Sequence, residues 1–254
     1  MPFLIVFYAQ NVGPYFAIVP IKSYTARDEI VCTIPCLSRD DISYSNVGGA
    51  RLTTGFAVRP ATRADVPAIA DLLLEGFGHE YGGMLRQRAG RRFLERIHAL
   101  PGRLNGIVVA VDGANVPVGV AGLRTWELTP RFDRAEEQAM FEELGVGPSI
   151  ALDLRAAMTE PPPYRPQLTE AYIYSVTVTK AWRGRGVADS ILEYLHCRAK
   201  DLGKTTALLE VIETNLPARR LYERHGYALV RRRRGLLAWL PFGAPALLLL
   251  SKEL

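Results

Sequence analysis

Four successive patterns between residues 171 and 211 constrain the fold of this chain more than any other feature of its sequence. Side chains alternate with period two over 171–179, as in a strand with two distinct faces. A turn with two glycines follows, then an apolar stripe at helical spacing that ends at Gly203, and then the buried-type strand pattern of 205–211. One predicted face of the first strand carries Tyr172, Tyr174, Val176 and Val178, and the other carries Ile173, Ser175 and Thr177. This order of elements predicts a domain built around a sheet.

Further patterns extend the domain from residue 56 to the end of the chain. Residues 56–59 predict a short strand, and Thr62 with Asp65 three positions later forms a capping box for the helix that follows. The other predicted elements are helices over 84–100, 131–144 and after the cap Asn215, and strands over 107–111, 116–124, 227–233 and 246–252. We therefore predict an α/β (α+β) single-sheet domain over residues 56–254.

Two segments do not fit this regular order. Residues 1–55 show no helical periodicity, and we interpret them as an N-terminal extension of unknown role. Residues 1–21 carry no charged side chain, but Gln10, Asn11, Pro14 and Pro20 interrupt them, so we expect no membrane anchoring. Residues 127–169 are far longer than an ordinary connection and are predicted to be an insertion.

Composition excludes several classes of protein. With 254 residues, of which 48% are apolar and 22% charged, the chain is neither disordered nor a disulfide scaffold. An odd total of three cysteines favours reduced thiols in a cytoplasmic protein, and the four histidines share no metal-ligand spacing, so we expect no metal. The net charge of +5 and the run Arg231–Arg234 indicate an anionic partner, but no base-reading motif accompanies them, and we do not expect nucleic-acid binding.

The glycine-rich turn is the strongest chemical feature. It reads Arg183-Gly184-Arg185-Gly186-Val187-Ala188 and lies between a predicted strand and the start of a predicted helix. Free N–H groups at a helix start, small residues and two guanidinium groups together can hold a pyrophosphate. The turn by itself is a weak signal, because solvated arginines in a tight turn look the same.

The residues downstream make the signal specific: Leu209-Glu210-Val211 on a strand, then Asn215 and Ala218, then Leu221-Tyr222-Glu223 and Gly226-Tyr227. Residues 56–254 resemble a GCN5-related N-acetyltransferase, with the match in order and spacing concentrated in 172–227. The pattern is most similar to the subgroup that acetylates the N-terminal alanine of ribosomal proteins. This resemblance implies a mixed, mostly antiparallel central sheet flanked by helices.

The resemblance also implies the site residues. Residues Arg183, Gly184, Arg185, Gly186, Val187 and Ala188 would hold the pyrophosphate of acetyl-CoA through backbone N–H groups. Residues Val176, Thr177 and Val178 would pair with the pantetheine arm like a strand, with the Val176 N–H polarising the thioester carbonyl. Asn215 would bond the same arm or cap its helix, and Tyr222 would protonate the departing thiolate, unless it is only a packed aromatic.

The base and the acceptor are less defined. Glu210 stands where the N-terminal acetylating relatives carry their proton acceptor; the alternatives are a salt-bridged strand carboxylate, with Arg219 or Arg220 as partner, or a water chain. Glu170 is a second candidate base that we expect to be solvated. The apolar link 236–242 either walls the acceptor site or forms part of a homodimer contact. Glutamates 136, 137, 142 and 143, with Asp153 and Glu160, either attract a cationic amine or are simply solvated.

We therefore expect an acetyl-CoA-dependent N-acetyltransferase in which a primary amine of a small molecule or peptide N-terminus attacks the thioester directly. Cys197 is not expected to be a nucleophile, because its neighbour His196 points away from it on a helix. The alternative is a non-catalytic CoA-binding regulatory module, which would not need a proton donor at the sulfur.

Overall fold

The computed structural model describes residues 55–77, 88–128, 134–151, 164–234 and 246–254. The predicted extension, apart from Gly55, lies outside these residues, as do the first residues of the helix predicted over 84–100 and the link 236–242. The boundary near residue 55 therefore remains a prediction. Among the described residues, no helix is both long and apolar enough to cross a membrane.

The described chain forms a seven-stranded sheet in the order β1-β2-β3-β4-β5-β7-β6, in which only β4 and β5 pair in parallel. The strands are β1 (Phe56–Pro60), β2 (Ile107–Asp112), β3 (Pro117–Thr125), β4 (Glu170–Val178), β5 (Thr206–Ile212), β6 (Ala228–Arg233) and β7 (Leu247–Glu253). The helices are α1 (Val66–Phe77), α2 (Arg88–His98), α3 (Arg134–Leu144), α5 (Val187–Asp201) and α6 (Leu216–Arg224). Short 3-10 turns are η1 (Arg63–Asp65) and η3 (Lys180–Trp182). The mixed, mostly antiparallel sheet confirms the predicted fold class.

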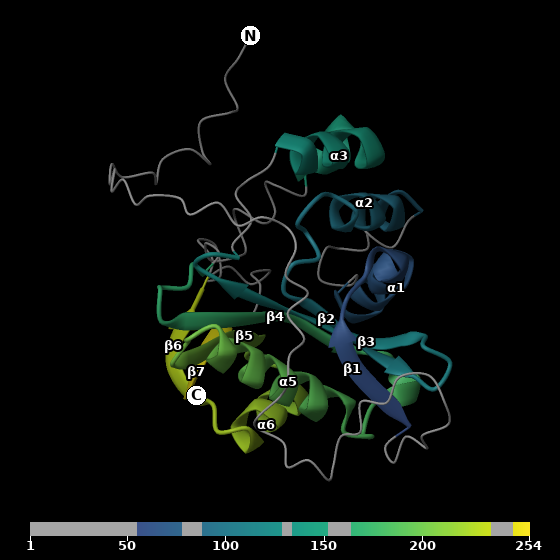
Figure 1. Cartoon of the computed structure of the whole chain (residues 1–254). Helices are drawn as coiled ribbons and strands as arrows, with labels where there is room; N and C mark the ends of the chain where they lie inside the picture. The colour runs from purple at the N-terminus through teal and green to yellow at the C-terminus, as the bar shows by residue number, and fades with distance from the viewer. Residues whose placement is uncertain (1–54, 78–87, 129–133, 152–163, 235–245) are drawn as a thin grey trace, which may run out of the picture. The chain divides into compact units, whose positions relative to one another are not determined.

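Helices cover both faces of the sheet (Figure 1). The strand β2 shows why, because its side chains alternate between two cores. Ile107, Val109 and Val111 pack with Ile69 of α1. Val108 and Ala110 point to the other face and pack with Ile191 of α5. The α1 face and the α5 face of the sheet are therefore separate layers, and α6 lies on the α5 face because Tyr222 belongs to that core.

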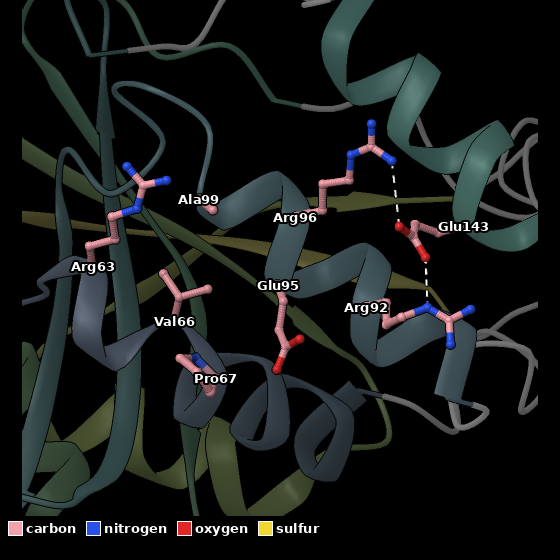
Figure 2. Close-up of a pocket in the computed structure, with 8 residues that line it drawn as sticks. All are labelled: Arg63, Val66, Pro67, Arg92, Glu95, Arg96, Ala99 and Glu143. Atoms are coloured by element: carbon pink, nitrogen blue, oxygen red, sulfur yellow. Dashed lines mark hydrogen bonds and ion pairs between the residues drawn. The ribbon is translucent and has the colours of Figure 1, made fainter.

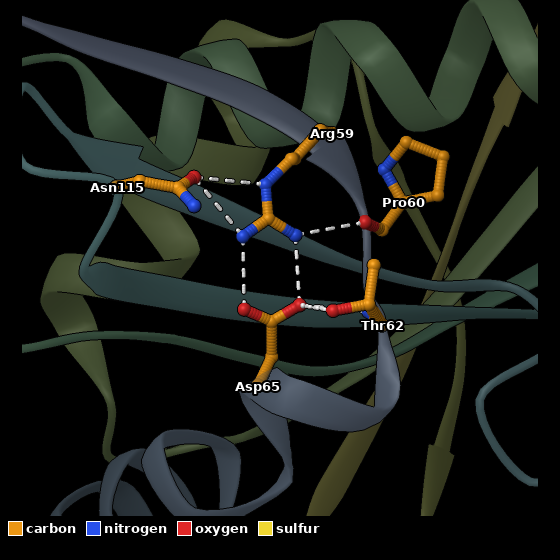
Figure 3. Close-up of polar contacts among 5 residues, drawn as sticks. All are labelled: Arg59, Pro60, Thr62, Asp65 and Asn115. Atoms are coloured by element: carbon orange, nitrogen blue, oxygen red, sulfur yellow. Dashed lines mark hydrogen bonds and ion pairs between the residues drawn. The ribbon is translucent and has the colours of Figure 1, made fainter.

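The start of α1 confirms the capping box predicted from Thr62 and Asp65 (Figure 3). The Asp65 carboxylate accepts hydrogen bonds from the Thr62 N–H at 2.7 Å and from both terminal nitrogens of Arg59 at 2.7 and 2.9 Å. Hydrogen bonding to Arg59 lowers the pKa of Asp65 to about 2, although burial acts in the opposite direction. Asn115 accepts from the same guanidinium, so the cap also fixes the β2–β3 turn.

The first part of the insertion is a packed layer. Helix α3 lies beside α2 and buries Ala139 completely against Phe93 and Leu94 (Figure 1). Its glutamates are ion-paired with arginines of α2 and of the turn after it, as Arg92–Glu143, Arg96–Glu142 and Arg103–Glu136. Glu136, Glu142 and Glu143 therefore remain partly exposed to solvent, as one of the two alternatives predicted, and their charges are engaged by arginines. Asp153 and Glu160 lie outside the described residues.

Strand β4 departs from simple alternation at Ser175. Tyr174 lies opposite Gly122 of β3 but Thr177 lies opposite Val120, so β4 has one residue more than β3 between these pairs. Ser175 adopts a positive φ of 55°, which accommodates the extra residue. The bulge moves Val176 and Val178 onto the α5 face with Ile173, whereas Tyr172 packs with Leu208 and Leu249 on the opposite face. The prediction that both tyrosines and both valines share one face was therefore wrong.

Candidate functional site

The two parallel strands at the centre of the sheet part at their carboxyl ends. The pairing of β4 with β5 covers Glu170–Ile173 opposite Thr206–Leu209. Strand β4 continues to Val178 and β5 to Ile212, and these ends pair with β3 and β7 but not with each other. Ser175 and Val176 lie in the bulge and are paired neither with a residue of β3 nor with a residue of β5. The backbone of β4 is therefore available for strand-like hydrogen bonds to an extended ligand between β4 and β5.

The glycine-rich turn lies directly beyond the end of β4. Gly184 and Gly186 adopt φ values of 73° and 80°, in the left-handed region that L side chains rarely occupy. Within the described part of the chain, no atom outside their immediate neighbours lies within 4 Å of the position that a Cβ would take at either residue. Gly186 is the N-cap of α5 and accepts the first helical hydrogen bond, from Ser190. The following N–H groups, from Val187 and Ala188 onward, lie in the first turn of α5, where a helix has no internal partners for them.

The arginines of this turn contact the protein as well as solvent. The Nε of Arg183 donates to the Val178 carbonyl at 2.8 Å, and one of its terminal nitrogens lies 3.7 Å from Glu75 of α1. The Arg185 guanidinium lies 5.0 Å from the centre of the Trp182 ring. Arg183 is therefore oriented by the end of β4, and both guanidinium groups border the start of α5.

Glu75 fixes the beginning of the same turn. Its carboxylate accepts hydrogen bonds from the Lys180 N–H at 2.8 Å and from the Thr179 hydroxyl at 2.9 Å. Burial alone would raise the pKa of Glu75, but these hydrogen bonds outweigh it, and the pKa lies below its usual value. Sequence analysis missed Glu75, because 104 residues separate it from Thr179.

Asn215 caps α6 as predicted, since its side-chain oxygen accepts from the Ala218 N–H at 3.3 Å. Helix α6 is tied to the first turn of α5 through Asp189, whose carboxylate lies 3.0 Å from the His225 ring and 3.2 Å from Arg224. A contact between Asn215 and a ligand remains a prediction.

Tyr222 is buried on the inner face of α6, with 6% of its surface exposed. Burial raises the pKa of its hydroxyl to about 12, so the phenol is protonated at neutral pH. Its ring lies 6.0 Å from Tyr227, whose hydroxyl is 2.8 Å from His196 Nε2. Burial, with nearby cations, lowers the pKa of His196 to about 3, so this ring is neutral and engaged with Tyr227 rather than with Cys197.

Glu210 lies on β5 and is almost fully buried. It forms an ion pair with Arg233 of β6 and accepts a hydrogen bond from the Tyr172 hydroxyl at 3.0 Å. The salt-bridge partner is therefore Arg233, and the expectation of Arg219 or Arg220 was wrong. Glu170, which we expected to be solvated, accepts from the Tyr164 hydroxyl and from the Gln167 N–H, both at 2.9 Å.

Aromatic side chains line the sheet between these two carboxylates. Tyr164 stacks on Tyr172 with ring centres 5.7 Å apart, and burial together with Glu210 raises the pKa of Tyr172. Tyr174 lies across β3 at Gly122, where an added Cβ would lie 2.6 Å from the tyrosine hydroxyl. Arg124 lies over the Tyr174 ring, its guanidinium carbon 4.8 Å from the ring centre. Arg124 and Gly122 were missed because neither carries a local motif.

A separate hollow of about 460 Å³ lies between α1 and α2 (Figure 2). Arg63, Val66 and Glu95 are among the residues that line it, together with Arg92 and Glu143, which pair with each other. None of the residues predicted for the site lines this hollow. Within the described ranges, no group of three or more histidines, cysteines, aspartates or glutamates could hold a metal ion.

Comparison with known proteins agrees with this geometry. Residues 156–227 match the family model described as the acetyltransferase (GNAT) family. Over 71 residues the chain is 41% identical to YdgE, an uncharacterised N-acetyltransferase of Bacillus subtilis strain 168, and this match covers 28% of the chain and 45% of YdgE. The chain thus spans less than half the length of this curated relative.

Two solved structures show the same fold. One is an acetyltransferase, with a TM-score of 0.58 and 22% identity, covering 78% of this chain and 98% of the other. The second, described as histone acetyltransferase HPA2 and related acetyltransferase from Corynebacterium glutamicum, has a TM-score of 0.53 and 24% identity, covering 78% of this chain and 96% of the other.

Proposed function

We propose that this chain, which has the fold of the GNAT acetyltransferases and matches their family model over residues 156–227, is an acetyl-CoA-dependent N-acetyltransferase. The acceptor would be a primary amine of a small molecule or a peptide N-terminus. One observation carries the proposal: the parallel strands β4 and β5 separate where a turn with two left-handed glycines leads into α5. This arrangement offers strand backbone and helix N–H groups to one elongated, anionic ligand.

The residues present fit acetyl-CoA as a co-substrate. The open space at Gly184 and Gly186 allows a pyrophosphate to approach the backbone, and Arg183, Arg185 and the N–H groups of Val187 and Ala188 supply positive potential. The bulged end of β4, Val176–Val178, would pair with the pantetheine arm, and Asn215 would bond it from the start of α6. No metal is invoked, because the amine can attack the thioester without one.

In the proposed reaction the neutral amine nitrogen attacks the thioester carbonyl carbon directly. A C–N bond forms, the C–S bond breaks, and the departing thiolate takes a proton from the Tyr222 hydroxyl. The proton that the nitrogen loses on becoming an amide restores the Tyr222 hydroxyl. The raised pKa of Tyr222, about 12, keeps this proton in place until the thiolate forms. The Val176 N–H would stabilise the oxyanion of the tetrahedral intermediate. His196 is buried against Tyr227 and is not placed to activate Cys197, so no acetyl-enzyme is expected.

The proton of the incoming ammonium goes to Glu210 or to a water chain that ends at it. Glu210 lies on the face of the sheet opposite α5 and is already bonded to Arg233 and Tyr172. To accept a proton it must exchange one of these partners, which favours a water between the amine and the carboxylate.

Sequence likeness to enzymes that acetylate ribosomal-protein alanines keeps a peptide N-terminus among the candidate acceptors. The proposed site of action is the cytoplasm, with a homodimer contact through 236–242 as a separate hypothesis. The regulatory alternative is less favoured, because a protein that only bound CoA would need neither Tyr222 nor Glu210 in these positions.

The test is release of free thiol from acetyl-CoA across a panel of amines, amino acids and short peptides, with CoA binding measured in parallel by calorimetry. Substitution of Tyr222 by Phe should lower kcat by at least about 100-fold and leave CoA affinity within a factor of about three. Mass spectrometry after incubation with acetyl-CoA alone should find no acetylated cysteine.

Tyr227→Phe is the matched control, since it removes a neighbouring buried hydroxyl that has no proposed chemical role. This variant should lose stability through the His196 hydrogen bond and keep kcat within about threefold. Full activity in Tyr222→Phe would contradict the donor role, and absence of CoA binding by the wild-type protein would overturn the proposed function.

A further inference from the structure

Arg124 is a cation without a counter-charge among the residues that the structure describes. It lies on β3 directly opposite Tyr172 of β4, on the face of the sheet that carries Glu210. Its Nε is buried and has no hydrogen-bond partner among the described residues, and within the same residues its guanidinium forms no ion pair. Its guanidinium lies over the face of the Tyr174 ring.

A buried donor without a partner is costly. An unsatisfied buried donor loses its hydrogen bonds to water without replacement, and the loss is greater when the group is charged, so native proteins seldom keep one without a reason. The two nearest arginines show the contrast, because Arg103 is paired with Glu136 and Arg233 with Glu210. Both act on the neighbouring tyrosines as positive charges, as Arg124 does. Unlike Arg103 and Arg233, Arg124 therefore carries a positive charge that no carboxylate of the described ranges compensates.

The position of Arg124 is fixed by its surroundings. Gly122 lets the Tyr174 ring lie flat across β3, since any side chain at residue 122 would overlap the ring. The guanidinium rests on that ring at 4.8 Å, a distance typical of a cation–π contact. A planar group held this way presents its free N–H edge in a defined direction, which suits a carboxylate better than a spherical ion.

Arg124 lies on the same face of the sheet as Glu210, the proposed proton acceptor. Tyr172 links the two ends of the site, because it is the cross-strand partner of Arg124 and donates a hydrogen bond to Glu210. Arg124 on β3 and Glu210 on β5 are two strand spacings apart, or about 10 Å along the sheet. A small zwitterion bound at this face would place its carboxylate at Arg124 and its amine toward Glu210, next to the Tyr172 hydroxyl.

We propose that Arg124 binds a carboxylate of the acceptor, so that the preferred substrate is a small amino acid whose amine lies toward Glu210. This inference rests on the proposed function and narrows its substrate class. A polypeptide N-terminus has no carboxylate at this distance from its amine unless an acidic side chain supplies it. Arg124 therefore selects free amino acids against their amides and against neutral peptides.

The test compares three forms of the same compound: a set of free L-amino acids, their C-terminal amides, and the amines that lack the carboxyl group. Wild-type protein should show kcat/KM values about 10- to 100-fold higher for the best free acids than for the matching amides, the range expected for a charge-assisted pair. Arg124→Met should reduce this ratio to about threefold or less, and Arg124→Lys should restore part of it. Arg63→Met removes an exposed arginine from the hollow of Figure 2 and should leave the ratio unchanged.

A second readout does not depend on turnover. With CoA bound, calorimetry should show that wild-type protein binds an N-acetyl amino acid more tightly than its amide, and that Arg124→Met loses this difference. Carboxylate-dependent binding without thiol release would support the Arg124 site and contradict the proposed acetyl transfer. Three results would overturn the Arg124 inference: equal rates and binding for acids and amides, a preference that persists in Arg124→Met, or turnover with neutral peptides alone. In each case, any release of thiol would still support the proposed acetyltransferase activity.

Discussion

The helical layer formed by α1, α2 and α3 and the central strands β3, β4 and β5 use charged residues in different ways. In the helical layer, Arg92, Arg96 and Arg103 are each paired with a glutamate of α3. On the central strands Arg124 has no such partner, and the turn that follows β4 presents backbone N–H groups at the start of α5. The first region uses its charges to hold two helices together, and the second keeps charge and backbone available for a ligand.

This difference shows that the number of charged residues on an element does not indicate its role. The four glutamates of α3 looked like an attraction for a cationic substrate, yet three of them pair with arginines within the same layer. The feature that points to function is a polar group whose expected partner is missing from the described protein. Four substitutions can break or sharpen this contrast.

The largest effect is expected for Gly186→Ala in the turn before α5. A left-handed backbone costs an alanine about 1–2 kcal/mol, and relief of that strain would rotate the N–H groups at the helix start. We expect acetyl-CoA kcat/KM to fall by about 100-fold, as for a small misplacement of a binding group. Gly203→Ala is the matched control, with φ of 71° and open space but at the other end of α5. It should lose similar stability in urea unfolding and keep CoA affinity; equal CoA affinity in both variants would contradict the role of the turn.

Gly122→Ala should have the next largest effect. The added Cβ overlaps the Tyr174 ring, and overpacking of this kind costs about 1–3 kcal/mol. The displaced ring no longer supports Arg124, so the preference for free amino acids should fall as well. In a double-mutant cycle, Tyr174→Ala should recover most of the stability lost in Gly122→Ala but not the preference. Additive losses of stability would show that the ring and the glycine are not coupled.

Asp65→Asn tests a charge inside the helical layer. The substitution removes the ion pair with Arg59. This pair contributes about 1–2 kcal/mol to the free energy of unfolding, after allowance for solvent at the partly exposed arginine. Because the folded pKa of Asp65 is about 2, below its usual value, the stabilisation is fully present above pH 4 and is lost as pH falls through 2. Urea unfolding at pH 7 and at pH 3 should therefore show a smaller difference between wild type and variant at the lower pH. Asp71→Asn, which breaks an exposed pair with Arg91, is the control and should change stability by less than about 0.5 kcal/mol.

The smallest effect is expected for Arg92→Met, which removes one exposed side of the α2–α3 pairing. A surface ion pair contributes about 0–1 kcal/mol, so stability should change little and the change should shrink at high salt. Acetyl transfer should be unaffected. A fall in kcat/KM for the acceptor, with stability unchanged, would contradict the contrast between the two regions, because it would show that the helical layer takes part in substrate binding.

Local patterns predicted most of the fold and the turn of the site. The strand at 171–178, the glycines at 184 and 186, the cap at Asn215 and the capping box at Thr62 each involve residues close in sequence, and each lies where expected, although the alternation of the strand holds only as far as Tyr174. The bulge at Ser175 could not be predicted, because it depends on how β4 pairs with β3, and the sequence of one strand does not determine that pairing.

The charged contacts could not be predicted for the same reason. The Glu210–Arg233 pair joins strands that are not adjacent in the sheet, and Glu75 reaches a turn more than 100 residues away. Arg124 was missed because its significance lies in the absence of a described partner, and a missing contact leaves no pattern in the sequence.

Helix α1 contacts both the end of β4 and the start of the glycine-rich turn. Gly76 lies so close to Thr177 that an added side chain would overlap it, and the adjacent Glu75 holds the N–H of Lys180 and the hydroxyl of Thr179. Any tilt of α1 must therefore carry the end of β4 and the first residues of the glycine turn with it. Helix α1 therefore sets the position of the last residues of β4 and of the turn together, so a substitution that shifts α1 should displace both parts of the proposed acetyl-CoA site.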